Sequence, residues 1–284
     1  MALHHVQSVT RPATLEEAWG EKEKWGKAAR FLGGGIDVVL YTPPSVESLI
    51  DLTGLGLSGV TQDVAGITIG ATTTMTEAIE SSEIRAYAHA FLIDVLKEVA
   101  SPLQRNVATF GGTLGSAHPW SDVIPALLVL DATLILYDGA ERTAGLEQFL
   151  ADRARGRGTG PIICGIRIPR ALESSRGAHA AFTRTAFDVA TLNVSCVAPA
   201  GKSRWSDLRI AVGGTPGLAT RLRDVESAAV REAMSEEGIA DAAASAVNAR
   251  DDARASGEYR RTVARALVAR CLRRISEEPE GNVG

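Results

Sequence analysis

The most informative part of the sequence is a glycine-rich segment, Ala108-Thr109-Phe110-Gly111-Gly112-Thr113-Leu114-Gly115-Ser116, which continues into His118-Pro119-Trp120-Ser121-Asp122. We predict that this segment is a loop. Consecutive backbone N–H groups turned into one concavity bind anions, and Thr109, Thr113 and Ser116 add hydroxyl groups. Asp122 can accept hydrogen bonds from ribose or ribityl hydroxyls. The alternative is that Asp122 caps a helix that begins at Val123.

A second glycine segment lies about 75 residues upstream, with the sequence Leu32-Gly33-Gly34-Gly35-Ile36-Asp37. We predict a strand, a glycine turn and a short helix. Three glycines allow positive φ angles and a close approach of a ligand to the backbone, so a pyrophosphate fits there. The alternative is a plain tight turn. The segment is neither a Rossmann fingerprint nor a P-loop. Together, the two segments suggest one long ligand that is held from two sides.

Beyond these segments, the chain is divided into two parts. A polar stretch from Pro169 to Gly177 is the best candidate for a boundary. After it, the residues 180–184, 194–197 and 208–212 are expected strands, and the chain from Thr220 to about Ile275 is expected to be helical. We predict an α+β fold with residues 1–175 as one domain, whose lobes are about 1–55 and 56–175, and with residues 176–284 as a smaller domain of three strands plus helices.

Composition excludes several classes of function. The chain has 284 residues and a net charge of −4, so it has no basic excess with which to bind nucleic acid. The longest apolar stretch, Val123 to Tyr137, contains Asp131 and is too short to span a bilayer. Residues 1–6 do not read as a secretory signal. The three cysteines are widely spaced, which fits neither a disulfide framework nor a metal cluster and favours the reducing cytoplasm.

Three stretches together resemble a known family. Leu32–Leu40, Ile69–Thr74 and Arg105–Leu130 are similar to the FAD-binding medium subunits of molybdenum hydroxylases, which include the flavoprotein subunit of aerobic carbon monoxide dehydrogenase and the flavin domain of xanthine dehydrogenase. The similarity continues in order through 166–169, 188–194, 213–216 and 259–261, so it covers nearly the whole chain.

The resemblance implies a two-lobed FAD-binding domain of the vanillyl-alcohol-oxidase type, followed by the small C-terminal domain of these flavoproteins. In that family, the first glycine segment holds the FAD pyrophosphate, and the second holds further phosphate and ribityl groups. Asp122 would bind polar groups along FAD, and Ile163 would pack near the isoalloxazine ring. The full set of implied cofactor-binding residues is Leu32, Gly33, Gly34, Gly35, Ile36, Asp37, Thr109, Phe110, Gly111, Gly112, Thr113, Asp122 and Ile163.

The sequence departs from the family pattern at a few positions. Ile36 stands where a polar residue is common, and Thr113 replaces the usual Asn. A lysine that lies near the flavin in some relatives corresponds to Thr183, which leaves Arg184 as an alternative source of positive charge. These changes bear on redox tuning more than on FAD binding.

The sequence shows no catalytic acid, base or nucleophile and no spacing of metal ligands. If FAD is bound, the cofactor carries the electron chemistry. The resemblance therefore implies an electron-transfer subunit that takes electrons from 2Fe-2S clusters on a small subunit, while molybdopterin is bound by a large subunit, in a dimer of heterotrimers. Two alternatives stay open: a flavin-free scaffold subunit and a stand-alone flavin oxidoreductase of the same fold.

Overall fold

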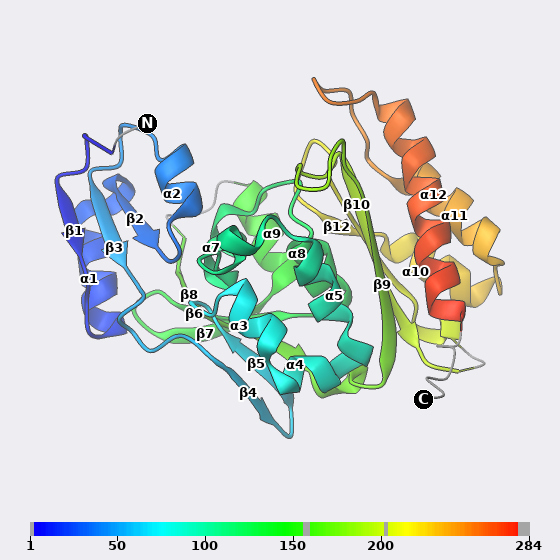
Figure 1. Cartoon of the computed structure of the whole chain (residues 1–284), viewed down its shortest axis with the longest axis horizontal. Coiled ribbons are helices and arrows are strands. Elements are labelled where there is room, and N and C mark those ends of the chain that lie inside the picture. The colour runs from blue at the N-terminus through cyan, green and yellow to red at the C-terminus, as the bar shows by residue number, and fades with distance from the viewer. Residues whose placement is uncertain (1–2, 156–159, 202–203, 278–284) are drawn as a thin grey trace. The chain divides into compact units, whose positions relative to one another are not determined.

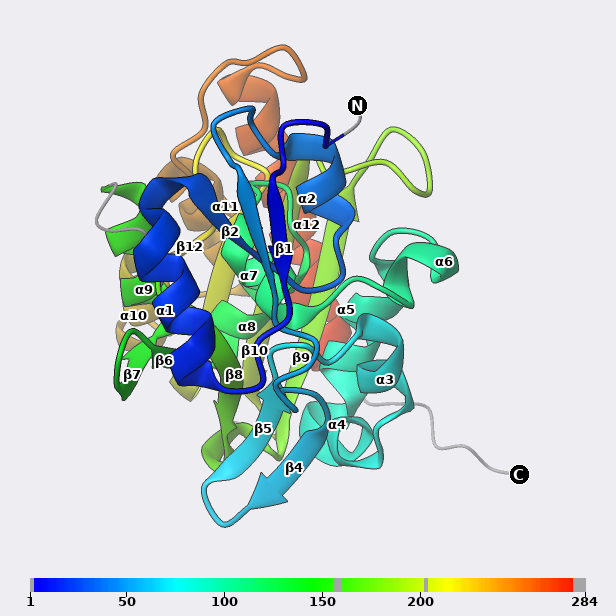
Figure 2. The same ribbon diagram turned by 90° about the vertical axis from the view of Figure 1, so that its left-hand side faces the viewer.

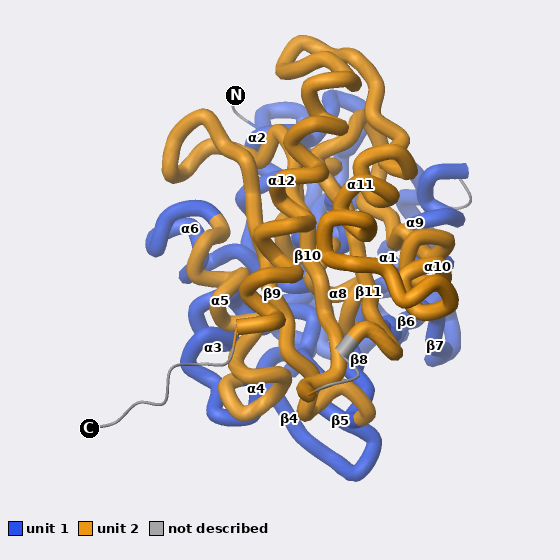
Figure 3. The backbone as a smooth tube through the Cα atoms, turned by 90° about the vertical axis from the view of Figure 1, so that its right-hand side faces the viewer, with its two compact units in different colours: residues 1–84, 100–117, 131–170 blue, residues 85–99, 118–130, 171–284 orange. Residues whose placement is uncertain are grey.

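The structure is a computed structural model that describes residues 3–155, 160–201 and 204–277 (Figure 1). Met1 and Ala2 therefore lie outside the described residues. The chain forms two compact units, each built from several segments (Figure 3). The first consists of residues 1–84, 100–117 and 131–170, and the second of residues 85–99, 118–130 and 171–284. The mixture of helices and sheets confirms the predicted α+β class.

The first unit begins with a parallel sheet of three strands in the order β1 (Ser8–Thr10), β3 (Ser48–Asp51), β2 (Ala29–Leu32). Helices α1 (Leu15–Trp25) and α2 (Ile36–Tyr41) accompany it (Figure 2). Successive residues of β3 point to opposite faces: Ile50 packs in the same apolar cluster as Ala18 of α1, and Leu49 packs with Val38 of α2. The small sheet is therefore covered by one helix on each face.

The rest of the first unit is built on an antiparallel sheet of five strands. Their order is β4 (Val60–Asp63), β5 (Gly66–Gly70), β8 (Ile162–Pro169), β6 (Thr133–Tyr137), β7 (Glu141–Gly145). The accompanying helices are α3 (Met75–Glu80), α6 (Pro102–Arg105), α7 (Phe110–Ser116) and α9 (Leu146–Ala154), and α4 (Ser82–Ala86) follows α3.

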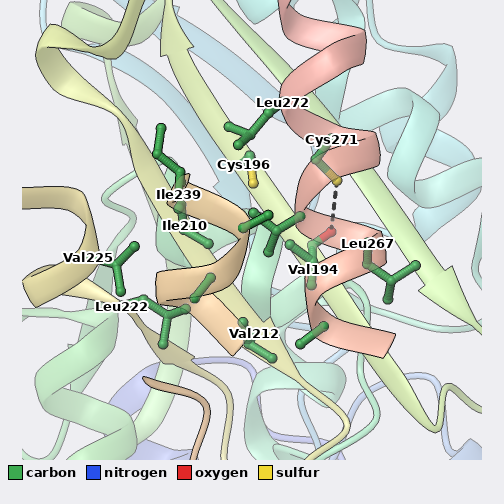
Figure 4. Close-up of a cluster of buried hydrophobic side chains, with 14 of the residues drawn as sticks. Val194, Cys196, Ile210, Val212, Leu222, Val225, Ile239, Leu267, Cys271 and Leu272 are labelled. Carbon is green, nitrogen blue, oxygen red and sulfur yellow. Dashed lines mark hydrogen bonds between the residues drawn. The ribbon is translucent and has the colours of Figure 1, made fainter. Parts of the chain in front are cut away.

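The second unit contains an antiparallel sheet in the order β12 (Thr220–Arg221), β11 (Arg209–Gly213), β10 (Leu192–Pro199), β9 (Ser175–Phe182). Its helices are α5 (Phe91–Glu98), α8 (Val123–Val129), α10 (Arg223–Arg231), α11 (Glu236–Ala246) and α12 (Gly257–Ser276). Val194 and Cys196 of β10 belong to an apolar core shared with α11 and α12, where the Cys271 thiol contacts the Val194 carbonyl at 3.8 Å (Figure 4).

Backbone conformation ends or interrupts several elements. Helix α1 ends at Trp25, because Gly26 takes a φ of 54°. The stretch from 86 to 99 is not one continuous helix, since Ala88, His89 and Ala90 all have positive φ. The C-terminal sheet gains a two-residue fourth strand, β12, at Thr220–Arg221, where the expected helical region begins, and helices α10, α11 and α12 follow it. No helix among the described residues is long and apolar enough to cross a membrane.

Candidate functional site

The two glycine segments are in direct contact within the first unit. A Cβ atom added to Gly34 would lie 1.5 Å from the Val107 carbonyl oxygen, and one added to Gly33 would lie 2.7 Å from the Thr109 hydroxyl oxygen. Both distances are far shorter than van der Waals contact. Glycine is therefore required at Gly34, where the turn that follows β2 lies against the backbone that leads into α7, and Gly33 lies against the side chain of Thr109.

The first segment is a strand, a glycine turn and a helix, as predicted. Gly35 has a φ of 82° and precedes the first residue of α2, and the first helical hydrogen bond of the turn runs from the Val39 amide to the Gly35 carbonyl. The amides of Ile36 and Val38 therefore have no acceptor within the helix. Such amides favour a negatively charged group, and the Gly33–Asp37 turn is partly exposed.

The second segment is not the loop of free donors that the sequence suggests. It forms helix α7, and each amide of its first turn already donates to a protein acceptor. The Phe110 amide donates to the Thr73 carbonyl at 3.2 Å, and the Gly111 amide donates to the Ala71 carbonyl at 2.7 Å. The amides of residues 112 and 113 donate to the hydroxyl and the carbonyl of Thr109 at 3.1 and 3.0 Å. These four amides therefore stabilise the segment itself and are not available to bind a ligand.

The polar groups that the second segment can offer are hydroxyls. Thr109 accepts from the Gly112 amide, so its own hydroxyl proton stays available for donation. The Thr113 hydroxyl is partly exposed and hydrogen-bonds none of the described residues. The side chain of Phe110 is fully buried, which makes it an anchor of the segment in the core.

A third sequence-predicted element joins the other two within this unit. The Ala71 amide donates to the Cys164 carbonyl at 3.0 Å, and the Ala71 carbonyl accepts from Gly111. A Cβ on Gly111 would lie 2.9 Å from that carbonyl oxygen. Ala71 thus ties the start of α7 to β8 directly beside Ile163, whose side chain is 7% exposed.

The cysteine beside Ile163 is a buried thiol. Burial, followed by the nearby negative charge of Glu141, raises the pKa of Cys164 to about 11. A thiol with this pKa stays protonated at neutral pH and is a poor nucleophile. Cys196 and Cys271 are also free and buried. Among the described residues, no group of three His, Cys, Asp or Glu side chains could hold a metal ion.

Asp122 lies in the second unit, at the residue before α8, but its side chain makes no capping hydrogen bond. Asp122 thus occupies the N-cap position of α8, as the alternative expects, but its side chain does not cap the helix. Its Oδ1 atom instead accepts from Asn193 Nδ2 at 2.6 Å and lies 3.3 Å from His179 Nε2. The carboxylate is turned toward the sheet of the second unit.

His118, Trp120 and Arg184 also have partners among the described residues. His118 stacks on Trp120 with ring centroids 4.6 Å apart, and the Arg254 guanidinium lies 4.9 Å from the centroid of the Trp120 ring. Arg184 forms an ion pair with Asp188 at 2.7 Å, and this hydrogen bond lowers the pKa of Asp188. The positive charge of Arg184 is therefore neutralised locally.

Some residues that support the site carry no signal of their own in the side-chain pattern. Ala71 and Thr73 hold α7 through backbone groups, which no side-chain pattern reveals. A signal did exist for Asn193: it is a polar residue in the middle of the otherwise apolar strand β10, and it is fully buried. His179 occupies a comparable position in β9.

Two known families match this chain. Residues 4–171 match the family described as the FAD binding domain in molybdopterin dehydrogenase, and residues 178–275 match the family described as the CO dehydrogenase flavoprotein C-terminal domain. The first match includes both glycine segments and covers more than half of the chain. The resemblance expected from the sequence is thereby confirmed.

Individual relatives are similar over nearly their full length. The glyceraldehyde dehydrogenase medium chain of Sulfolobus acidocaldarius is 24% identical over 277 residues, which are 95% of this chain and 98% of the relative. The carbon monoxide dehydrogenase medium chain of Hydrogenophaga pseudoflava is 25% identical over 92% of this chain and 94% of its own.

Solved structures have the same fold. A chain of carbon monoxide dehydrogenase from Hydrogenophaga pseudoflava matches with a TM-score of 0.85 at 24% identity, over 94% of this chain and 96% of that chain. A chain of quinoline 2-oxidoreductase from Pseudomonas putida 86 matches with a TM-score of 0.83 at 20% identity, over 95% and 96%. With both of its parts matched in order, this chain belongs to the family of FAD-binding subunits of the molybdopterin dehydrogenases.

Proposed function

We propose that this chain is the FAD-carrying electron-transfer subunit of a multi-subunit molybdopterin hydroxylase or dehydrogenase, and that it takes electrons from iron–sulfur clusters of a partner subunit to an external acceptor. The observation that carries the proposal is the direct contact of Gly34 with the Val107 backbone and of Gly33 with the Thr109 side chain. This contact supports a single site for one extended ligand, and the family match identifies that ligand as FAD.

Backbone amides, hydroxyl groups and an apolar side chain would together bind the cofactor. We propose that the Gly33–Val38 turn holds the FAD diphosphate, because its glycines allow a close approach to the backbone and the N-terminus of α2 favours a negatively charged group. Thr109 and Thr113 would supply hydroxyl contacts, and Ile163 would supply an apolar surface for the ring. Leu32, Phe110, Gly111 and Gly112 would keep these groups in place. Bound FAD supplies reversible acceptance and release of electrons.

Asp122 is proposed as a further cofactor contact on the strength of the family resemblance. Its position in the chain, within the long Arg105–Leu130 match, supports this role. Ile36 would contribute its amide only, since its side chain cannot hydrogen-bond.

The division of labour between subunits follows from what this chain contains. Three cysteines are fewer than the four thiolates that hold a [2Fe–2S] cluster, so the clusters would be bound by a small partner subunit and molybdopterin by a large one. We further propose a dimer of such heterotrimers in the reducing cytoplasm, where the three free thiols are stable. The domain division at residue 175 is part of the same proposal.

The test is a titration of the flavin-free chain with FAD, followed by co-purification from the native source. Quenched flavin fluorescence with saturable binding, and partner subunits that carry molybdenum and iron, are the expected results. A chain that takes up no FAD yet still binds both partners would indicate the scaffold alternative. Turnover of an organic substrate by the isolated flavoprotein would indicate the stand-alone oxidoreductase instead.

A further inference from the structure

One face of the β9–β10 pair carries three polar side chains that are removed from water. His179 is 5% exposed, and Asn193 and Ser195 are both fully buried. The neighbouring residues of β10, Val194 and Cys196, point to the opposite face and join the apolar core. Burying polar groups is unfavourable unless they are hydrogen-bonded, so three of them on one face of a sheet call for an explanation.

These side chains converge on the segment that ends at Asp122. Asn193 Nδ2 lies 2.6 Å from Asp122 Oδ1, 3.1 Å from the Ser121 carbonyl and 3.4 Å from the Trp120 carbonyl. A single amide group therefore holds both the carboxylate and the backbone that carries it. The Gly214 amide adds a hydrogen bond of 2.6 Å to the Pro119 carbonyl, which fixes the same segment to the end of the sheet.

His179 completes the arrangement, and its partners determine its tautomer. Nε2 faces Asp122 Oδ1 at 3.3 Å, and Nδ1 faces the Ser195 hydroxyl at 2.9 Å. An ionised carboxylate can only accept hydrogen bonds, so Nε2 must carry the proton. In the neutral ring, Nδ1 then accepts the hydroxyl proton of Ser195. The chain of donors runs from Ser195 through His179 to Asp122.

The result is a carboxylate with one oxygen held and one oxygen free. Oδ1 has two protein donors, whereas Oδ2 hydrogen-bonds none of the described residues, and the Asp122 side chain is 17% exposed. A carboxylate held this way presents its second oxygen in a fixed direction. Groups fixed in advance lose less conformational freedom when a ligand binds.

We propose that Asn193 and His179 are positioning residues that fix the Asp122 carboxylate so that Oδ2 accepts a hydrogen bond from a hydroxyl group of the bound cofactor. This inference rests on the proposed function, because it takes Asp122 as a contact to FAD. In a purely structural role, the same hydrogen bonds would only tie α8 to the sheet. Asn193→Leu would then lower FAD affinity equally with and without the Asp122 carboxylate.

The test is a double-mutant cycle on FAD affinity, measured by flavin fluorescence with the flavin-free chain. Asn193→Leu removes the amide donor at nearly constant volume, and we expect it to weaken FAD binding about tenfold, the usual effect of a hydrogen bond to a charged group. Asp122→Ala should weaken binding by a similar factor. Because Asn193 acts through Asp122, Asn193→Leu should change the affinity less than about twofold in the Asp122→Ala background.

Two further variants separate positioning from general damage. His179→Phe should weaken FAD binding, whereas His179→Gln, which keeps an amide donor where Nε2 stood, should restore most of the affinity. Val194→Ala is the matched control: it lies next to Asn193 in β10 but faces the apolar core, so it should lower the unfolding temperature and leave FAD affinity unchanged. If Asp122→Ala does not fold, Asp122→Asn replaces it in the cycle.

The outcomes distinguish this inference from the function on which it rests. A wild-type chain that binds no FAD overturns the proposed function. If the wild type binds FAD and Asp122→Ala binds it with the same affinity, the contact between FAD and Asp122 is overturned. The positioning role of Asn193 and His179 is then overturned as well. Equal losses from Asn193→Leu in both backgrounds, or a loss of affinity in Val194→Ala that matches its loss of stability, overturn the positioning role alone.

Discussion

Gly34 and Gly115 belong to the two different glycine segments and differ in what surrounds them. A Cβ on Gly34 would lie 1.5 Å from a backbone oxygen, whereas a Cβ on Gly115 in α7 would meet nothing within 4 Å. The number of glycines in the two segments therefore does not measure their importance. What matters is whether another piece of backbone occupies the space of the missing side chain.

This contrast gives a paired prediction. Gly34→Ala should destabilise the chain by about 3 kcal/mol, because the turn must move away from Val107, and it should abolish FAD binding in the same fluorescence titration. Gly115→Ala should stabilise α7 by about 0.5–1 kcal/mol, since alanine is the better helix former, and leave FAD affinity intact. Retention of normal FAD affinity in Gly34→Ala would contradict the proposed site.

Cys164 allows a second prediction at the residue scale. With a pKa of about 11, its thiolate fraction at pH 8 is about 0.1%, against roughly a quarter for an unperturbed cysteine. We expect folded protein to resist alkylation at Cys164 at pH 8 and the rate to rise about tenfold per pH unit up to pH 10. Peptide mass mapping after timed alkylation measures this. Rapid labelling at pH 8, with the protein still folded, would show that β8 exposes the thiol.

At the scale of elements, α7 marks the limit of sequence reasoning. Glycine is a poor helix former, so the sequence of residues 110–116 predicts a loop, and only the hydrogen bonds to Ala71, Thr73 and Thr109 explain the helix. The short helix after Gly35 was predictable, because a strand and a glycine turn precede it. Local patterns thus located two segments that contact each other, while the conformation of α7 depends on a distant stretch of backbone.

Helix α12 is joined to the segment before it by a buried arginine. Arg260 is 1% exposed. Its guanidinium donates to both oxygens of Asp252 at 2.7 and 2.8 Å, to the carbonyls of Arg250 and Ala255 at 2.7 and 2.9 Å, and to the Thr191 carbonyl at 3.3 Å. One side chain thus satisfies three carbonyls and a carboxylate.

We predict that Arg260→Met costs about 3 kcal/mol of unfolding free energy, because it leaves these acceptors without a donor. Arg261→Met, at the exposed neighbouring position, should have an effect within about 0.5 kcal/mol. Denaturant unfolding of both variants at pH 7 provides the measurement. Equal small losses would mean that the segment before α12 is not held by Arg260.

The same pair has a defined dependence on pH. The hydrogen bonds from Arg260 lower the pKa of Asp252 in the folded chain. A carboxylate with a depressed folded pKa contributes stability above its unfolded pKa of about 3.9, and this contribution is lost as the pH falls through the folded value. The stability gap between wild type and Arg260→Met should therefore narrow below about pH 4. A gap that stays constant down to pH 2 would contradict this account.

At the scale of the whole molecule, the order of elements along the chain and the grouping of elements in space differ. The sequence suggests a cut near residue 175, and the family matches also change between residues 171 and 178. The compact second unit, however, includes residues 85–99 and 118–130. Sequence patterns could not reveal this, since α5 and α8 read as ordinary apolar helices of the preceding region.

A fragment of residues 171–277 should therefore not fold alone. It lacks α5 and α8, which pack on β9, β10 and β11. Phe91 of α5 lies so close to Gly177 that a Cβ there would be 2.4 Å from the ring, and Asp122, the partner of Asn193, is absent as well. Without them, one face of the sheet exposes buried groups to water.

We expect this fragment to retain helical circular dichroism but to bind the dye ANS and to melt without a cooperative transition, as chains do that have lost specific packing. Supplying residues 1–170 as a second chain should restore a sharp transition, because those residues contain both missing helices. A fragment that melts cooperatively alone and binds no dye would show that the C-terminal sheet and its helices are self-sufficient. In that case α5 and α8 would serve the first unit rather than the second.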